Sequence, residues 1–305
     1  MKLRDISNND TLTISAVVEL LKNSVLLQLA EFYQMTGNAD NKRKAASASG
    51  GSFRALDNNY ASNQITPAFA SVVLKIFGGH VQVDRAHERR GADIGSVRAT
   101  ELVNFVKNLA KNFNDKFFNG VISATEFNGL KAIMPAGQKL APATDGFQVL
   151  AGNDNAARKS QQAFVEYIHY LISKLDGGAG ALFMNGAVLA RLTTIANEHI
   201  VRTPNEFGVL IPYFDGIPLI NPGYNASGTE ILPSTETCGT NAATTSIYAV
   251  SFGESSNLSI ASNKGLEVVD LGLVGVHYTH SVELDADLAL LNDKAVGQLA
   301  GIEIV

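Results

Sequence analysis

The chain has 305 residues, 46% of them hydrophobic and 17% charged, with a formal net charge of −5. This composition is typical of a globular protein and excludes a disordered one. The length allows one or two domains with a hydrophobic core. The single cysteine, Cys238, excludes an intrachain disulfide and suits a reducing cytoplasm. No run approaches the ~18 apolar residues that span a bilayer, and the start MKLRDISNND is unlike a secretory signal. We therefore expect a soluble chain made in the cytoplasm.

The front of the chain contains a helix and then a long polar extension. Residues 12–30 repeat apolar side chains at helical spacing, which predicts an amphipathic helix after a short polar arm. Residues 36–68 are rich in Gly, Asn, Ser and Ala and include the basic run Lys42-Arg43-Lys44. So long a stretch without a core face is typical of a functional extension. We interpret it as a two-stranded hairpin that a neighbour must cover.

The middle of the chain predicts strands followed by a long helix. Residues 69–84 are strand-like, with Gly78-Gly79 as a bend or bulge. Residues 96–118 carry apolar residues every three or four positions, and Ser96 is the expected N-cap. Gly120 ends this helix.

The rear of the chain alternates helices and strands around a tight hairpin. Apolar strands flank the turn Asp215-Gly216, and Asn185 is expected to cap a helix. The remaining predicted elements are a helix at 160–175, a strand at 181–184, a helix from 186 to about 198, and strands at 246–252, 266–273 and 276–284, followed by a tail at 288–305.

Charge is split between the two parts of the chain. Residues 1–120 contain 15 Lys+Arg and 11 Asp+Glu, a net of +4, and residues 121–305 contain 9 and 18, a net of −9. This indicates either a front part that faces an anionic partner or acidic subunit, or chance segregation of solvated side chains.

The search for catalytic motifs finds none. The glycine-rich run at 176–180 follows a helix and precedes a strand, the reverse of a dinucleotide fingerprint, and is better explained as a helix end. His277 and His280 form the closest histidine pair, but i, i+3 spacing in a strand points the rings to opposite faces. His169 is expected to be a partly buried structural histidine. We predict no catalytic residue, metal ligand or cofactor, and only weak phosphate contact by scattered basic residues.

The order of elements resembles a known family. An arm, a protruding loop, strands, a long helix, a helix-and-sheet region, a hairpin ending G-x-P, the strand SIYAVSFG and the closing segment GLEVVDLGLV follow one another. This order is similar to that of the major capsid proteins of tailed double-stranded DNA phages with the Hong Kong 97-type fold. The resemblance implies an α+β fold divided into an N-terminal arm and helix (1–32), an extended loop (33–68), a peripheral domain (69–124) with spine helix 96–118, an axial domain (125–245) and closing strands shared between both domains (246–305).

The resemblance also implies a function. The chain would be a non-enzymatic shell subunit that forms hexamers and pentamers of an icosahedral capsid around packaged double-stranded DNA. It would be assembled in the host cytoplasm and reside in the virion, without contact to a membrane. Its expected partners are a separate scaffolding protein, a portal, a decoration protein and, non-specifically, the packaged DNA.

Candidate contact residues follow from the same resemblance. In the extended loop they are Lys42, Arg43, Lys44, Phe53, Arg54, Leu56 and Tyr60. In the arm and the charged link, as contacts between capsomers, they are Leu3, Arg4, Arg85, Arg89 and Arg90. As hinges they are Gly50, Gly51, Gly78 and Gly79.

Three alternatives remain. An encapsulin-type compartment shares the fold. A soluble metal-dependent hydrolase would use the histidines, and a DNA-binding module would use the basic residues.

Overall fold

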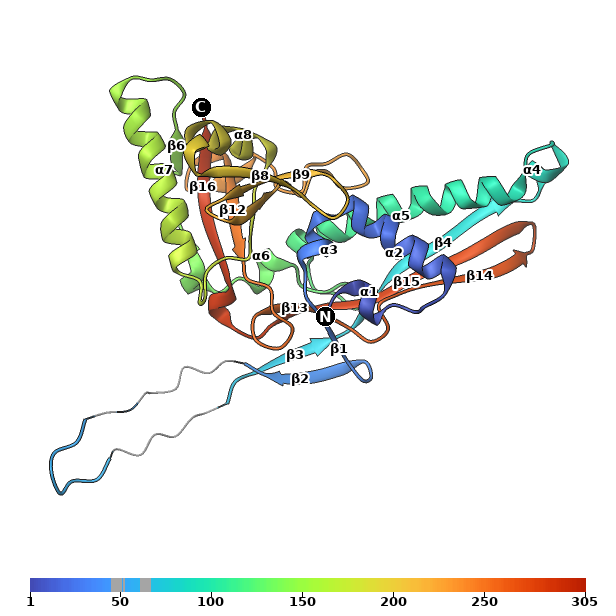
Figure 1. Cartoon of the computed structure of the whole chain (residues 1–305), viewed down its shortest axis with the longest axis horizontal. Helices are drawn as coiled ribbons and strands as arrows, with labels where there is room; N and C mark the ends of the chain where they lie inside the picture. Colours follow the sequence, from blue (N-terminus) through green and yellow to red (C-terminus); the bar gives the residue numbers. More distant parts are fainter. Residues whose placement is uncertain (45–50, 52, 61–66) are drawn as a thin grey trace.

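A computed structural model describes residues 1–44, 51, 53–60 and 67–305. Figure 1 shows an elongated arm of strands and helices that joins an upright body of helices and sheet. The arm contains a five-stranded sheet, the body a nine-stranded sheet, and a separate two-stranded ribbon leaves the molecule near their junction.

The N-terminal helix is interrupted, in contrast to the single helix predicted for residues 12–30. The structure has α1 (Leu3–Ile6), α2 (Thr11–Asn23) and α3 (Val25–Leu29). Ser24 breaks the helix because its hydroxyl accepts a hydrogen bond from the Leu27 amide at 3.1 Å and donates one to the buried Asn114 at 2.6 Å. A serine in this position caps α3, which turns the chain toward β1 (Phe32–Gln34).

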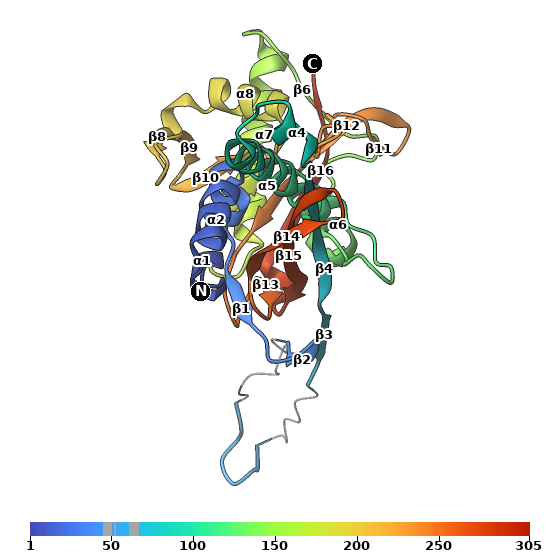
Figure 2. The same cartoon turned by 90° about the vertical axis from the view of Figure 1, so that its right-hand side faces the viewer.

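The extension is a two-stranded hairpin at its base. Strands β2 (Ala39–Arg43) and β3 (Phe69–Val73) pair in antiparallel fashion, and β3 continues across Leu74 into β4 (Lys75–Asp84) (Figure 2). The hairpin starts later than the predicted boundary at residue 33, because β1 pairs in parallel with β13 (Leu258–Ser262) and buries Phe32 and Tyr33. Gly50 lies outside the described residues.

The sheet of the arm is built on one long strand. Strand β15 (His277–Leu290) pairs with β13, with β14 (Leu266–Val274) and, on its other edge, with β4. A short helix, α4 (Ala86–Arg89), lies at the far end of the arm (Figure 1).

The bulge predicted at Gly78-Gly79 is wrong. Strand β4 pairs with β15 residue for residue, from Lys75 opposite Ala286 to Asp84 opposite His277, without a shift in register. A Cβ atom on Gly78 would collide with the carbonyl oxygen of Val282, and one on Gly79 would lie 3.2 Å from the Phe105 ring. The glycines therefore allow the neighbouring strand and the long helix to approach closely.

The long helix α5 runs from Ile94 to Asn119 and starts two residues before the predicted position. Its N-cap is Asp93, whose carboxylate accepts a hydrogen bond from the Gly95 amide at 3.2 Å, so the prediction of Ser96 is wrong. Asp93 has an extended backbone, as an N-cap requires, whereas Ser96 already lies in the first turn. The buried face is the one that the apolar spacing predicts: Leu102, Val106, Leu109, Phe113 and Phe117.

The body contains the nine-stranded sheet, in the order β5-β16-β12-β7-β10-β9-β8, with β11 on β12 and β6 on β16. The strands are β5 (Lys139–Leu140), β6 (Phe147–Val149), β7 (Ala181–Phe183), β8 (Ile200–Pro204), β9 (Leu210–Phe214), β10 (Ile217–Ile220), β11 (Glu236–Cys238), β12 (Asn241–Val250) and β16 (Val296–Ile304). The helices are α6 (Leu130–Ile133), α7 (Asn155–Ser173) and α8 (Gly186–Ile195), with 3-10 turns at Ala136–Gln138, Asn197–His199 and Asp293–Ala295.

Several local predictions for the body are confirmed. Asn185 caps α8 by accepting a hydrogen bond from the Val188 amide at 2.9 Å. The turn between β9 and β10 has positive φ at Asp215 (47°) and Gly216 (82°), as expected for a two-residue hairpin turn.

Other boundaries in the body differ from the predicted ones. Helix α7 starts five residues before Ser160, because Asp154 accepts a hydrogen bond from the Ala157 amide at 2.7 Å and caps the helix there. Helix α8 ends at Ile195, before a 3-10 turn, and β12 starts at Asn241 instead of Ser246. The predicted tail at 288–305 contains the end of β15 and the whole of β16.

Two hydrophobic cores meet at the central strands of the body. In β12, Tyr248 and Val250 pack in the core beneath α5, while Ile247 and Ala249 pack in the core beneath α7 and α8. Phe183 of β7 belongs to the first core as well. Because both faces of these strands are buried, their sequences read as continuous apolar runs.

Candidate assembly surfaces

The tip of the hairpin exposes large apolar side chains. Phe53 is fully exposed, and Leu56 and Tyr60 are 88% and 66% exposed. A turn forms here, with φ of 64° at Asp57, and the Arg54 guanidinium lies 5.2 Å from the centre of the Tyr60 ring. Exposed aromatic and aliphatic groups around one cation are typical of a surface that another molecule covers.

The base of the hairpin is held by its own subunit. Tyr33, Met35, Val72 and Leu74 pack in a small buried cluster. Burial raises the pKa of Tyr33 to about 12. The Val73 amide donates to the Asp287 carboxylate at 2.8 Å, and burial raises the pKa of this carboxyl group. The hairpin thus leaves the subunit from a fixed root.

The basic run at this root has divided roles. Lys44 pairs with Asp293 at 2.9 Å, and Lys42 pairs with Asp40 at 3.6 Å. Arg43 is exposed and forms no ion pair with the described residues. Of the three predicted contact residues, Arg43 is therefore the most available to a partner.

The far end of the arm gathers the predicted arginines of the charged link. Arg89 and Arg90 are exposed at α4, and the Arg85 amide donates to the Val276 carbonyl at 3.0 Å, which places α4 against the β14–β15 turn. The same turn exposes Leu273, Val274 and Val276, each about half exposed. The predicted contact at Leu3 is wrong, because Leu3 is completely buried in the core of its own subunit, whereas Arg4 is exposed.

A partly exposed polar cluster fixes α5 on the sheet of the arm. The Arg98 guanidinium pairs with Asp270 at 2.6 Å, contacts His280 Nε2 at 3.2 Å and lies 5.1 Å from the centre of the Tyr278 ring. Hydrogen bonding to Arg98 lowers the pKa of Asp270, and burial together with the Arg98 charge lowers the pKa of His280. This cluster joins α5, β14 and β15.

His277 and His280, the two histidines closest in sequence, do not form a common site. His280 faces Arg98, while His277 lies three residues away on the same extended strand. His169 is exposed, in contrast to the predicted partial burial, and its Nδ1 lies 3.8 Å from Asp215, which also contacts His199 at 3.2 Å. Across the described residues, no group of three or more His, Cys, Asp or Glu side chains is arranged to hold a metal ion.

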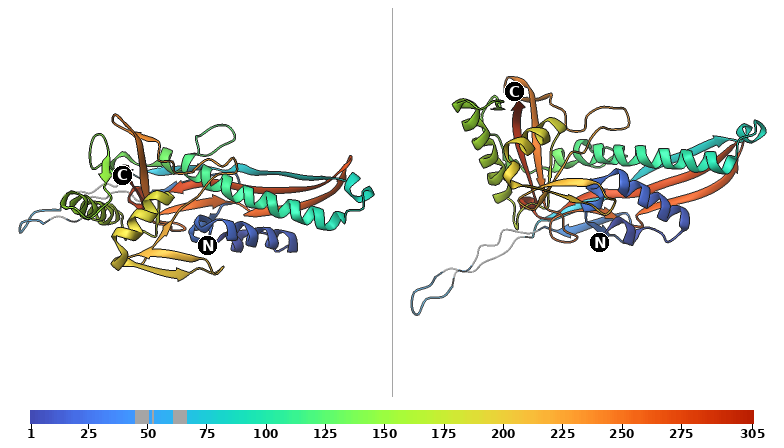
Figure 3. Two further views of the ribbon diagram at one scale, coloured as in Figure 1. Left: turned by 90° about the horizontal axis from the view of Figure 1, so that it is seen from above. Right: turned by 45° about the horizontal axis from the view of Figure 1, so that its top comes forward.

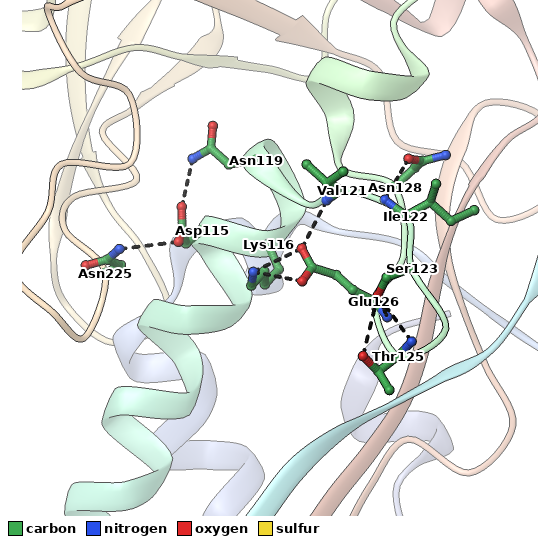
Figure 4. A network of polar contacts seen from close by, with 10 residues as sticks. All are labelled: Asp115, Lys116, Asn119, Val121, Ile122, Ser123, Thr125, Glu126, Asn128 and Asn225. Carbon is green, nitrogen blue, oxygen red and sulfur yellow. Dashed lines mark hydrogen bonds and ion pairs between the residues drawn. The ribbon is translucent and has the colours of Figure 1, made fainter.

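Sequence reasoning missed a rigid loop at residues 120–129 (Figure 4). Both oxygens of Glu126 lie 3.0 Å from Lys116 Nζ, and one also accepts a hydrogen bond from the Val121 amide. Burial opposes ionisation, but these bonds lower the pKa of Glu126 overall. Val121 and Ile122 are 69% and 64% exposed on this braced loop.

The sequence feature that could have predicted this loop is the glycine at each of its ends, Gly120 and Gly129. Gly129 donates its amide to the Gly120 carbonyl at 2.9 Å, and a Cβ on either residue would lie within 3.0 Å of backbone atoms. Close backbone approach of this kind requires glycine. The loop also receives the Lys75 ammonium group at the Ala124 carbonyl, 3.1 Å away.

None of the described helices is both long and apolar enough to cross a membrane.

Comparison with known proteins gives structural relatives only. No protein-family model and no curated protein sequence matches the chain. The encapsulin SrpI of Synechococcus elongatus is 14% identical with a TM-score of 0.63, over 92% of this chain and 87% of that one. The capsid of a native GTA particle is 14% identical with a TM-score of 0.57, over 93% and 90%. The procapsid of satellite phage P4, which includes the size-determination protein Sid, gives 10% identity and a TM-score of 0.57, over 98% and 93%.

These similarities extend over almost the whole chain. The mixed helix-and-sheet fold is therefore the one shared by Hong Kong 97-type capsid and encapsulin shells, as the order of elements predicted.

Proposed function

We propose that this chain is the major capsid protein of a tailed double-stranded DNA phage. The observation that carries the proposal is the capsid fold over more than nine-tenths of the chain. The bare hairpin tip, with Phe53 and Leu56 in solvent, supports it. Side chains of this kind are expected to be covered when copies of the subunit assemble.

In this proposal, subunits form hexamers and pentamers that close an icosahedral shell. The hairpin of one subunit, which leaves through β2 and returns through β3, crosses the peripheral domain of its neighbour. The axial domain (125–245) surrounds the symmetry axes, and the closing strands (246–305) join both domains. Each contact can be modest, because closure makes many contacts simultaneous and raises their effective concentration.

Contacts between capsomers are assigned to the far end of the arm. Arg89, Arg90 and the half-exposed Val274 are available there, and Arg85 is partly exposed. Arg4 joins them from the N-terminal arm (1–32). Leu3 is left out because it is buried within its own subunit.

The proposed partners are a separate scaffolding protein, a portal, a decoration protein and the packaged DNA. The net charge of −5 favours weak, non-specific DNA contact, with most phosphate charge neutralised by counterions. Assembly would take place in the host cytoplasm, the product would be the virion capsid, and the subunit would have no catalytic role.

An encapsulin-type compartment is the second candidate, favoured by the similarity to SrpI. The two candidates differ in cargo, which is double-stranded DNA for a phage and protein for a compartment. The hydrolase and the DNA-binding module have no comparable support.

The test is expression of the chain alone and with the scaffolding protein of its phage, followed by light scattering and negative-stain electron microscopy. Rings, tubes or hollow shells of megadalton mass are the expected result. A monomer or small oligomer under both conditions would contradict a shell function.

A further inference from the structure

Around Glu267 and Glu283, no described helix covers one face of the sheet in the arm (Figure 3). Helix α5 packs on the other face, where Phe105 meets Gly79 and Arg98 meets His280. Figure 3 shows α5 and α2 on the same side of the β4, β14 and β15 strands. The side chains of Glu267 and Glu283 alternate with buried neighbours and therefore point to the open face.

The open face concentrates negative charge. Glu267 on β14 lies directly opposite Glu283 on β15, and Asp285 follows two residues later on the same face. Like charges in directly opposite positions destabilise a pair of strands. We call Glu267, Glu283 and Asp285 the acidic face.

The described residues of the subunit form no ion pair with these charges. Among the described residues, no Lys, Arg or His nitrogen lies within 4.0 Å of the three carboxylates. Their side-chain partners are neutral: Ser281 donates to Glu283 at 3.0 Å, and Asn263 donates to Asp285 at 2.9 Å. Lys264 borders the same small cavity, but it forms no ion pair among the described residues. The isolated subunit thus carries a repulsion that a cationic partner would relieve.

Other groups on this face also lack a partner. Ile76 lies opposite Asp285 and is 73% exposed, and Val269, two residues from Glu267, is 43% exposed. Thr279 lies on the same face of β15 and is only 3% exposed, yet its hydroxyl has no hydrogen-bond partner among the described residues. Apolar and polar groups without partners therefore accompany the carboxylates.

We propose that the acidic face receives the hairpin tip of a second copy of this chain. Arg54 of the incoming tip pairs with Glu283 and Glu267, while Phe53 and Leu56 cover Ile76 and Val269. The tip matches the face because it places one cation between two exposed apolar groups, and Arg54 forms no ion pair in its own subunit among the described residues. This inference rests on the proposed shell function and identifies its receiving surface.

The geometry requires a neighbour. The hairpin root, β2 and β3, points away from the arm that carries β14 and β15 (Figure 1). A tip that leaves one side of the subunit and a receiving face on the other produce a heterologous contact, and contacts of this type form rings when the rotation closes. Because the contact joins opposite charges, added salt should slow assembly.

The decisive experiment is a charge exchange. Glu283→Arg and Arg54→Glu are each expected to raise the critical assembly concentration about tenfold or more, which corresponds to about 1.4 kcal/mol per contact. The double variant restores the opposite charges in exchanged positions and is expected to recover most of the loss. Glu101→Arg is the matched control, because Glu101 is exposed on α5, and this variant should assemble as the wild type does.

A second readout separates assembly from folding. Glu283→Gln removes the like-charge repulsion, so the melting temperature of the unassembled subunit should stay constant or rise while assembly weakens. In a Cys238→Ser background, Arg54→Cys and Glu283→Cys should form a disulfide between subunits in assembled particles.

The outcomes distinguish the inference from the proposed function. If Glu283→Arg assembles like the wild type, or if the double variant is no better than the single ones, the acidic face is not the receiving surface, although the shell function stands. If the wild-type chain forms no large assembly even with its scaffolding protein, the shell function itself is wrong.

Discussion

The core beneath α5 and the tip of the hairpin use the same residue type in opposite ways. Phe113 of α5 is 1% exposed and packs edge-on against Phe77 at 5.6 Å, whereas Phe53 at the tip is fully exposed. In the first region the subunit supplies every contact that the ring needs. In the second region, partners are expected to supply them. The comparison separates residues that stabilise the subunit from residues that stabilise the assembly.

Truncation of the two phenylalanines tests this separation most strongly. Phe113→Ala removes a ring that also contacts Phe127 and should lower the free energy of unfolding by about 3–5 kcal/mol. Phe53→Ala should change it by less than about 0.5 kcal/mol, since the ring is fully exposed. Urea unfolding of the unassembled protein measures both values. A large loss for Phe53→Ala would mean that the tip folds back onto its own subunit.

Glycine substitutions sharpen the same comparison. Gly78→Ala places a methyl group on the Val282 carbonyl and should destabilise the arm by about 3 kcal/mol. Gly51→Ala meets no atom of the described residues within 4 Å and should leave the stability unchanged. Thermal unfolding of both variants checks this.

Assembly of the glycine variants tests the hinge hypothesis. If Gly51 is a hinge, bulky replacements there should impair assembly without changing the melting temperature. Normal assembly by such variants would exclude the hinge role of Gly51.

The pH dependence of stability reports on the covered face of the arm. Because the folded pKa of His280 lies below 6.5, the unfolded chain binds the proton first as the pH falls below 6.5. The contribution of His280 to stability is therefore fully present above pH 6.5 and is lost as the pH falls toward its folded pKa. His280→Gln should flatten this part of the profile, measured by urea unfolding between about pH 7.5 and about pH 5. An unchanged slope would exclude His280 as its source.

The Asp270 carboxyl group affects stability in a lower pH range. Its folded pKa is lowered by Arg98, so its contribution is present above 3.8 and is lost as the pH falls through the folded pKa. Protonation of His280 and protonation of Asp270 thus destabilise the arm in two separate pH ranges.

The smallest effect is expected at the root of the hairpin. Lys44→Ala breaks the partly exposed ion pair with Asp293 and should cost about 0.2–1 kcal/mol. The melting temperature and its dependence on salt would show this, with Arg43→Ala as a control that breaks no ion pair among the described residues. Equal losses in both variants would mean that Arg43 also holds the root.

Local sequence signals predicted many elements because their causes are local. Asn185 as a cap, Asp215-Gly216 as a turn and the buried stripe of α5 depend on neighbours within a few residues. The errors arose where distant contacts decide. Ser24 breaks a helix because Asn114 binds it, and Gly78 packs against β15 instead of forming a bulge.

The candidate surfaces were predictable only in part. The polar extension and the arginines at 85, 89 and 90 stand out in the sequence. The acidic face does not, because Glu267 and Glu283 are 16 positions apart and meet only through the register of β14 and β15. The braced loop that exposes Val121 depends in the same way on the contact between Lys116 and Glu126.

By itself the sequence determined the long helix α5, the turn at Asp215-Gly216, the apolar faces of the main elements and the presence of a long polar extension. These follow from periodicity and from residue chemistry within a few positions. Only the tertiary structure decided which charges oppose each other, which apolar side chains remain uncovered and that Leu3 is buried. Strand register and long-range packing set these features, because they bring together residues whose separation along the chain carries no local signal.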